Sequence, residues 1–260
     1  MILGEPVSIS DYLSRFPLHP HLLFETLAYL CAYQLYRLLR RRYGDSISSS
    51  NRWSVIAAAA VGAALGSKLL FFLEDPKLTL AHIHDAVFLM GGKTIVGALI
   101  GGLFAVELTK ELCGIKQRTG DLFAVPLCLG IAIGRIGCFF TGLADNTYGI
   151  PTSLPWGVNL GDGIPRHPVQ LYELVFVLVL GFLLFVWFQR PHASGDIFKG
   201  FMVGYACFRL FVDFLKPYPR FAGLDTLQWG CIVVIGYYAT DIWRWIAASL
   251  YKPVTAEQAT

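Results

Sequence analysis

Apolar runs of membrane-spanning length recur along this 260-residue chain and restrict the folds open to it. A helix that crosses a bilayer needs about 20 mostly apolar residues. Seven runs fit or approach this length: 21–39, 54–73, 94–113, 122–141, 169–189, 199–215 and 226–249. Only 15% of the residues are charged, whereas soluble domains carry about 25%. We therefore predict an all-α integral membrane protein with about seven transmembrane helices.

The distribution of lysine and arginine predicts the orientation, because cytoplasmic loops carry an excess of both. With the N-terminus outside, the cytoplasmic ends hold twelve: Arg37, Arg40, Arg41, Arg42, Arg52, Lys110, Lys116, Arg118, Arg190, Lys199, Arg244 and Lys252. The outer side holds six: Arg15, Lys77, Lys93, Arg166, Lys216 and Arg220. We predict one membrane domain over 1–260, with the N-terminus outside and the C-terminus inside. Residues 1–20 form an outer segment without a cleaved signal, 142–168 an outer-face cap and 250–260 a cytoplasmic tail.

Composition argues against several other classes. A net charge of +3 is too small to suggest nucleic acid, and the six cysteines are scattered without a CxxC pair or a disulfide framework. His82 and His84 have no further ligands at a suitable spacing. The GGKT at 91–94 is no phosphate loop, because the first glycine of that motif would fall on Val87. We predict neither a metal nor a cofactor.

An arginine interrupts the apolar run GIAIGRIGCFF at 130–140. A charge at the centre of a membrane helix costs about 3 kcal/mol on insertion scales. One interpretation is that Arg135 reaches the interface as an anchor. The other, which its distance from the helix end favours, is that it faces the bundle interior or a water cavity. Gly134 and Gly137 flank it and would let a ligand or a neighbouring helix approach closely.

A second arginine, Arg209, lies in the sixth run, and Asp213 follows four residues later on the same helix face. One interpretation is an internal ion pair. The alternative is an anion site built from Arg209 and Arg135, since the planar guanidinium suits phosphate. In a membrane the obvious anionic ligand is a phospholipid headgroup.

Polar residues cluster where the cap enters the fifth run, in RHPVQLYE at 166–173. Four prolines between 151 and 168 forbid a continuous helix through the cap. Gln170, Tyr172 and Glu173 fall in the first turns of the following helix. Glu173 either caps that helix through its dipole or joins a polar cluster that opens onto the headgroup site.

Arg166 and His167 directly precede this helix. A histidine has a pKa near about 6.5, so it can act as a general base at neutral pH. His167 is therefore the candidate base, and a hydrogen-bonded loop histidine is the alternative.

The chain resembles the bacterial prolipoprotein diacylglyceryl transferases. The blocks that carry the resemblance are GKTIVGALIGG (92–102), GRIGCFFTG (134–142), YGIPTSLPWGV (148–158), RHPVQLYE (166–173) and GYACFRLFVDFLKP (204–217). The resemblance implies an inner-membrane enzyme that transfers the diacylglyceryl group of phosphatidylglycerol to the lipobox cysteine of a prolipoprotein, releasing glycerol phosphate. It also implies headgroup or catalytic roles for Arg135 and Arg209. Asp213 falls where the family commonly has glutamate, and Gly149 matches the glycine that closes the signature.

Several positions depart from the family pattern. Residues 96–98 read Val-Gly-Ala where the family has His-Gly-Gly, and Cys138 replaces the signature asparagine. Glu25 stands where the family carries tyrosine, and in a lengthened segment Asp145 or Asn146 could stand in for the family's acidic residue. If the missing histidine is the base that activates the thiol, His167 or, less directly, Glu25 has to replace it.

Three hypotheses follow from the sequence. The chain is a diacylglyceryl transferase of this family, or it uses the same phospholipid site for another acceptor, or it binds phospholipid without catalysis. The retained arginines and the RHPVQLYE block argue against the third.

Overall fold

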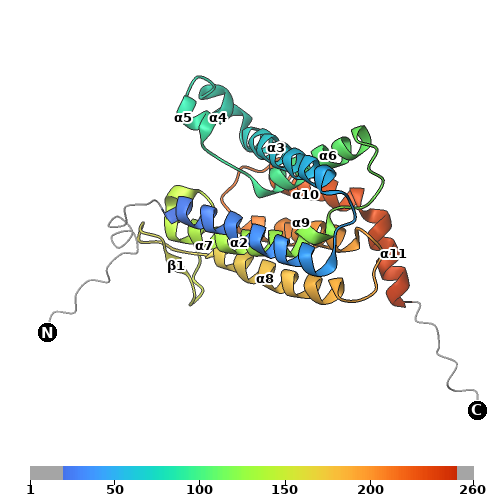
Figure 1. Cartoon of the computed structure of the whole chain (residues 1–260). Coiled ribbons are helices and arrows are strands. Elements are labelled where there is room, and N and C mark those ends of the chain that lie inside the picture. Colours follow the sequence, from blue (N-terminus) through green and yellow to red (C-terminus); the bar gives the residue numbers. More distant parts are fainter. Residues whose placement is uncertain (1–19, 251–260) are drawn as a thin grey trace, which may run out of the picture.

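A computed structural model describes residues 20–250 as helices that run back and forth between two ends of a bundle (Figure 1). The longer helices are α2 (Pro20–Tyr43), α3 (Ser49–Glu74), α6 (Ile95–Leu112), α7 (Asp121–Thr141), α8 (Val169–Phe188), α9 (Asp196–Val212), α10 (Thr226–Tyr237) and α11 (Ala239–Leu250). The short elements are α4 (Pro76–Ala81), α5 (Ala86–Met90), the 3₁₀ turns η1 (Gly142–Asp145) and η2 (Asp213–Leu215), and strands β1 (Val158–Asn159) and β2 (Pro165–Arg166). The predicted outer segment and C-terminal tail fall, except for Pro20 and Leu250, outside the described residues.

Each of the first six apolar runs corresponds to one long helix, but the prediction of a single helix over 226–249 is wrong. That run divides between α10 and α11, and α11 turns away from the axis of α10 (Figure 1). The turn brings two charged residues of α11 to the start of α9. There Asp241 pairs with Lys199 at 2.6 Å, and Arg244 pairs with Asp196.

Three described helical segments are long and apolar enough to cross a membrane: Ser49–Glu74, Asp121–Asp145 and Val169–Phe188. The remaining helices are shorter or carry more charge, as in the last turns of α6. Large apolar side chains nevertheless lie on the outside of the bundle, with Leu65, Phe104 and Phe182 about two-thirds exposed (68%, 71% and 66%). Exposed apolar surface of this kind suits a lipid environment. The structure is therefore that of an all-helical membrane protein, and the number of spans stays a prediction.

Glycines determine how closely α3 and α6 pack. A Cβ added to Gly66 would lie 2.3 Å from the carbonyl oxygen of Gly97, and one added to Gly62 would lie 2.4 Å from that of Gly101. The two glycines on each helix are four residues apart and share a face, the small-residue pattern that allows membrane helices to approach. This contact helps to bury Val96 in the core, with 3% of its surface exposed.

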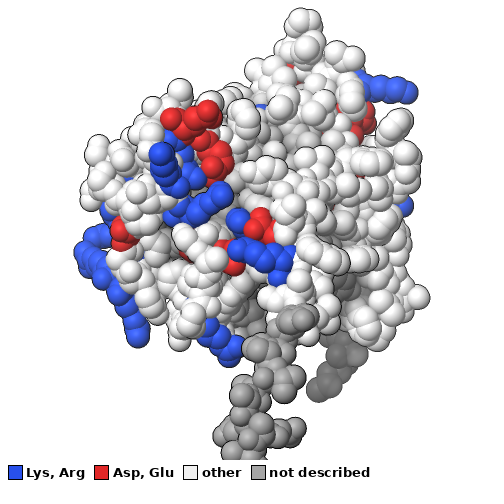
Figure 2. Space-filling model, turned by 90° about the vertical axis from the view of Figure 1, so that its right-hand side faces the viewer, with Lys and Arg blue, Asp and Glu red and all other residues white. Residues whose placement is uncertain are grey.

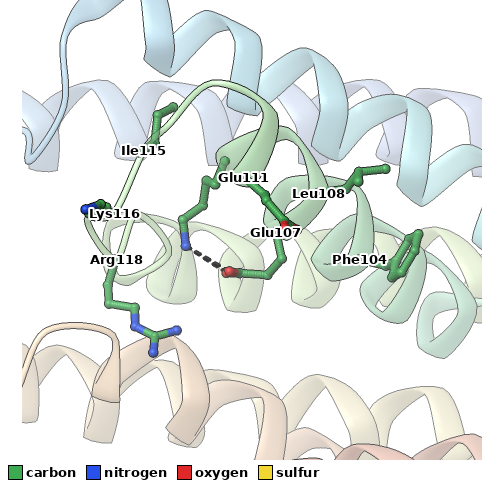
Figure 3. Close-up of a pocket in the computed structure, with 8 residues that line it drawn as sticks. Phe104, Glu107, Leu108, Glu111, Ile115, Lys116 and Arg118 are labelled. Carbon is green, nitrogen blue, oxygen red and sulfur yellow. Dashed lines mark hydrogen bonds and ion pairs between the residues drawn. The ribbon is translucent and has the colours of Figure 1, made fainter.

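The end of the bundle that carries α11 is charged, and Lys and Arg gather there beside Asp and Glu (Figure 2). Arg52 is 1% exposed and pairs with Asp45, which also accepts a 2.7 Å contact from Arg40. A cavity of about 440 Å³ opens beside the end of α6, where Lys110 contacts Glu107 at 2.9 Å (Figure 3). This end is the predicted cytoplasmic side.

The predicted cap lies at the opposite end, and its prolines prevent a continuous helix as expected. β1 and β2 form a two-stranded antiparallel pair in which Val158 faces Arg166, and a further bridge joins Pro151 to Arg166. The ends of α7 and α9 and the start of α8 meet beneath this segment (Figure 1). The helix ends thus bring the predicted polar residues of three helices into one region.

Candidate active site

Arg135 lies inside the bundle, as its position in the apolar run predicts, with 5% of its surface exposed. Its terminal nitrogen contacts Oε1 of Glu173 at 2.9 Å, and the Tyr205 hydroxyl donates to the same oxygen at 2.7 Å. Glu173 and Tyr205 are each 1% exposed. Helices α7, α8 and α9 therefore meet through one buried carboxylate. Glu173 belongs to a polar cluster, and this contact, not the helix N-terminus, accounts for its position.

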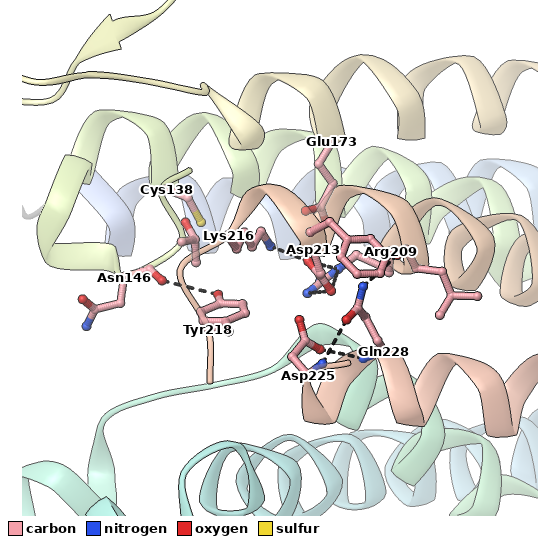
Figure 4. A network of polar contacts seen from close by, with 12 residues as sticks. Cys138, Asn146, Glu173, Arg209, Asp213, Lys216, Tyr218, Asp225 and Gln228 are labelled. Atoms are coloured by element: carbon pink, nitrogen blue, oxygen red, sulfur yellow. Dashed lines mark hydrogen bonds and ion pairs between the residues drawn. The ribbon is translucent and has the colours of Figure 1, made fainter. Parts of the chain in front are cut away.

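Arg209 forms the internal ion pair that was one of the two sequence interpretations. Its Nε donates to both Asp213 oxygens, at 3.1 and 2.9 Å, and a terminal nitrogen lies 2.8 Å from Oδ2. Lys216 reaches the other Asp213 oxygen at 3.1 Å. Figure 4 shows Arg209, Asp213 and Lys216 pointing toward one another, with Glu173 approaching from α8.

The Tyr205 hydroxyl connects the two arginines. Arg209 donates to it at 3.3 Å, while the hydroxyl itself donates to Glu173, the partner of Arg135. Each arginine therefore keeps its own carboxylate, and the two belong to one network. Ion pairs of this kind hold the planes of both guanidinium groups in place.

Unsatisfied donors mark the part of this network open to a ligand. Within residues 20–250, Nε of Arg135 has no hydrogen-bond partner, and neither has Nε2 or Oε1 of Gln170. Gln170 is 1% exposed and lies one turn before Glu173. A buried donor without a partner costs about 1–3 kcal/mol, more if it is charged. A polar or anionic ligand beside Arg135 and Gln170 would remove that cost.

The two glycines that flank Arg135 differ in their surroundings. A Cβ on Gly137 would lie 2.7 Å from Cβ of Phe24, so Gly137 allows α2 to approach α7 as predicted. A Cβ on Gly134 would meet no described atom within 4 Å. No neighbouring helix approaches Gly134 among the described residues, so of the two expectations only the approach of a ligand stays open there.

His167 belongs to a second polar group, at the base of the cap. Its Nδ1 lies 3.3 Å from the Tyr172 hydroxyl, which also accepts a 2.8 Å hydrogen bond from Nε1 of Trp156. This arrangement is the hydrogen-bonded alternative for His167, and it leaves a catalytic role untested. Tyr172 connects this group to α8, the helix that supplies Glu173.

Arg166 stabilises the cap. Its guanidinium donates to Asp162 at 2.9 and 2.7 Å and lies over the Tyr148 ring at 5.0 Å. The hydrogen bonds from Arg166 hold the pKa of the exposed Asp162 carboxyl below its usual value. Gly149 is needed for close approach, because a Cβ there would lie 2.4 Å from the carbonyl oxygen of His167.

Three residues that sequence reasoning did not bring together converge beside Arg135. His21 at the start of α2, Cys138 on α7 and Asp145 at the end of η1 each offer a ligand atom, all within 4.8 Å of one another. Nδ1 of His21 lies 3.1 Å from an Asp145 oxygen, and Sγ of Cys138 lies 3.6 Å from Arg135. Glu25, the less direct candidate base, is paired with Lys93 at 2.8 Å.

Sequence reasoning also missed Tyr205 and Lys216, although a signal existed for both. Tyr205, Arg209 and Asp213 are spaced by four residues and so lie on one helix face. Lys216 follows Asp213 by three. The convergence of His21 had no such signal, because it depends on α2 packing against the end of α7.

These observations define the class as an all-helical membrane protein with a buried arginine–carboxylate network at one end. The family model of the prolipoprotein diacylglyceryl transferases matches residues 8–245. The chain belongs to this family of transferases.

Its relatives include proteins named phosphatidylglycerol–prolipoprotein diacylglyceryl transferase. The one from Bordetella avium is 32% identical over 85% of this chain and 84% of the relative. The one from Bordetella parapertussis is 34% identical over 80% of this chain and 85% of the relative. The one from Clostridium tetani is 32% identical over 71% and 77%, respectively.

Proposed function

We propose that this chain transfers the diacylglyceryl group of phosphatidylglycerol to the lipobox cysteine of prolipoproteins. The names of its relatives give a diacylglyceryl transfer that involves phosphatidylglycerol and a prolipoprotein, and the lipobox cysteine as acceptor is part of the proposal. The observation in the structure that carries the proposal is the buried Arg135, whose Nε has no partner within residues 20–250. Gln170, whose amide also lacks a partner there, lies one turn before Glu173, the carboxylate that pairs with Arg135. A headgroup phosphate supplies the acceptors that both donors lack.

The proposal includes seven spans in a bacterial inner membrane, with the N-terminus and the cap outside. The charged end with α11 (Figure 2) then faces the cytoplasm, in agreement with the excess of lysine and arginine there. The arginine network lies in the outer half of the bilayer, where the cysteine of a secreted preprotein arrives.

The chemistry is a substitution at the glyceryl carbon. The acceptor sulfur forms a bond to that carbon, the carbon–oxygen bond to the phosphate breaks, and glycerol phosphate leaves with the bonding electrons. Negative charge grows on the phosphate oxygen in the transition state. Arg135 and Arg209 stabilise it in a site of low dielectric, where preorganised donors are most effective.

The remaining residues position this machinery. Glu173 and Asp213 orient the arginines, Gln170 binds the headgroup, and the open side of Gly134 gives the lipid space. Gly137 lets α2 close one wall. His167 accepts the thiol proton, since a thiol with a pKa near about 8.5 is only partly ionised at neutral pH. Tyr172, Arg166 and Gly149 shape the entrance under the cap.

The test is transfer to a synthetic lipobox peptide by purified protein in vesicles of phosphatidylglycerol, followed by mass spectrometry. Arg135→Lys keeps the charge but loses the planar fork, and we expect transfer to fall by about 10²–10³. The matched control is Arg52→Lys, which changes a buried arginine with a carboxylate partner at the other end of the bundle. We expect its transfer to stay within about threefold of the wild type.

Equal transfer by Arg135→Lys and the wild type would refute the phosphate role. A folded wild-type protein that binds the lipid but never modifies the peptide would overturn the transferase proposal in favour of a non-catalytic lipid-binding protein. A new lipid species without peptide modification would indicate another acceptor.

A further inference from the structure

The side chains of His21, Cys138 and Asp145 are of types that ligate metals, and only Cys138 contacts the arginine network, through Arg135. The cluster joins the start of α2, the last turns of α7 and the turn η1. The ligand atoms of all three lie within 4.8 Å of one another. Among the described residues, Nδ1 of His21 faces Asp145 at 3.1 Å yet makes no hydrogen bond of acceptable geometry.

The arrangement fits a metal ion better than a proton relay. A relay needs the imidazole between the thiol and the carboxylate, each on a different ring nitrogen. Here the three ligand atoms converge on one another, and the second ring nitrogen, Nε2 of His21, lies 3.8 Å from Glu25 instead. Tetrahedral zinc places its nitrogen, sulfur and oxygen ligands roughly 3.5 Å apart. The most widely separated of the three ligand atoms, up to 4.8 Å apart, would have to move closer by side-chain rotation to reach that spacing.

The donor set also selects the ion. Thiolate and imidazole suit zinc more than magnesium or calcium, which prefer all-oxygen sites. Three protein ligands leave one position of a tetrahedral ion open, as in catalytic zinc sites. Oε2 of Glu25 lies 3.8 Å from Nε2 of His21, beyond hydrogen-bond distance, so it would have to move closer to orient the ring as carboxylates behind zinc-bound histidines usually do.

We propose that His21, Cys138 and Asp145 bind a zinc ion whose fourth position takes the acceptor thiol. This inference rests on the proposed transferase function for the identity of the thiol, whereas the metal site itself does not. The metal site is well placed to bring the thiol to the lipid. Because Sγ of Cys138 lies 3.6 Å from a terminal nitrogen of Arg135, the metal would adjoin the proposed phosphate site.

The step balances without any further reactant. The acceptor thiol gives its proton to His167 or water as its sulfur coordinates the ion, since a metal-bound thiol is deprotonated. The sulfur then forms its bond to the glyceryl carbon and leaves the metal as a thioether. Glycerol phosphate departs with the electrons of the carbon–oxygen bond. This arrangement supplies thiol activation in a chain that has Val96 where a histidine is expected.

The test is metal binding by the purified full-length protein in detergent, stripped with a chelator and reloaded with zinc. We expect one zinc ion per chain. Loss of a group that orients a metal ligand weakens metal binding about 10–100-fold. Because Cys138 and His21 are themselves proposed ligands, we expect the zinc affinity of Cys138→Ser and of His21→Gln to fall by at least this factor. Cys31→Ser is the matched control, because Cys31 is an exposed thiol on α2, the helix that carries His21, and should bind zinc like the wild type.

Cobalt reports on the ligands directly. We expect cobalt-loaded wild type to show a thiolate-to-cobalt charge-transfer band that Cys138→Ser lacks. A lipobox peptide should strengthen the band, and the same peptide with serine for cysteine should not. Absence of the band in folded wild-type protein would overturn the proposal without reference to any variant, and so would zinc binding unchanged in Cys138→Ser.

Failure of this proposal and failure of the proposed function remain distinguishable. Zinc content and the cobalt spectrum are measured without phosphatidylglycerol, whereas the transferase test is peptide modification. Transfer that survives complete zinc removal overturns the role of zinc in binding and activating the acceptor thiol, and leaves the proposed function standing. A metal site of the expected kind without any transfer overturns the proposed function and the acceptor assignment, and leaves the metal site standing.

Discussion

Replacing Glu173 with glutamine tests whether the buried Arg135 is reserved for an anion. The glutamine keeps an oxygen that can accept from Arg135 and Tyr205, now 2.9 and 2.7 Å from the carboxylate. Size and hydrogen bonding therefore stay similar, and the change removes mainly the negative charge. Arg135 is left with no carboxylate partner at 5% exposure.

The loss of stability that we expect for Glu173→Gln follows from the burial of both Glu173 and Arg135. Removing one partner of a buried pair costs about 3–5 kcal/mol, and the retained hydrogen bonds place this variant near about 3 kcal/mol. For chains of this size each kcal/mol lowers Tm by about 2–4 °C, so we expect a loss of about 6–12 °C. A headgroup phosphate at Arg135 would restore about 1.5–3 kcal/mol, the value of a hydrogen bond to a charged group.

The assay is thermal unfolding of the purified protein in micelles containing either phosphatidylglycerol or phosphatidylcholine. We expect phosphatidylglycerol to raise Tm of Glu173→Gln by several degrees more than it raises that of the wild type. The control is Asp45→Asn, which removes the carboxylate beside the buried Arg52 at the far end. We expect that variant to lose stability without a selective gain from phosphatidylglycerol.

Equal protection of both variants by phosphatidylglycerol would refute an anion site specific to Arg135, because the effect would then be general to buried arginines. A Glu173→Gln variant as stable as the wild type in phosphatidylcholine would also refute this role, since Arg135 would then not depend on its carboxylate.

Two further predictions concern the core and the cap. Val96→His places an imidazole among apolar side chains at a position that is 3% exposed. We therefore expect the free energy of unfolding to fall by about 1–3 kcal/mol, measured by thermal unfolding. Unchanged stability together with increased transfer would instead show that the site lacks only a base. The pKa of Asp162 is lowered by Arg166, so its contribution to cap stability is complete above the ordinary carboxyl pKa and is lost as pH falls through the lowered value. We expect acid to increase hydrogen exchange in the cap of the wild type, and we expect Asp162→Asn to show faster exchange already at neutral pH with little further change; identical profiles would contradict the pairing.

Several site features were predictable because they are local. Asp213 follows Arg209 by one helical turn, and Gln170 and Glu173 share a helix face, so spacing predicts the ion pair as one of two interpretations and places the second pair on one side of its helix. The partner of Arg135 was not predictable in this way. Two interpretations of Glu173 were open, and only the packing of α7 against α8 shows that it meets Arg135 and not just the helix terminus.

The break between α10 and α11 escaped prediction for a related reason. Hydrophobicity continues through the run, and the signal that ends the helix is the attraction of Asp241 and Arg244 to residues more than 40 positions earlier. An apolar run predicts that a helix forms, but it carries no information on distant charged partners.

The sequence by itself determined the helical membrane class and the positions of the first six long helices, and it favoured a buried Arg135. These properties follow from local hydrophobicity and from the need to satisfy backbone hydrogen bonds within each segment in lipid. Only the tertiary structure decided which groups meet between helices. Glu173 joins Arg135 to Tyr205 across three helices, and His21 reaches Cys138 and Asp145 because Gly137 allows α2 to pack closely on α7. Such contacts depend on how helices approach one another, and that approach depends on the side chains of both partners together.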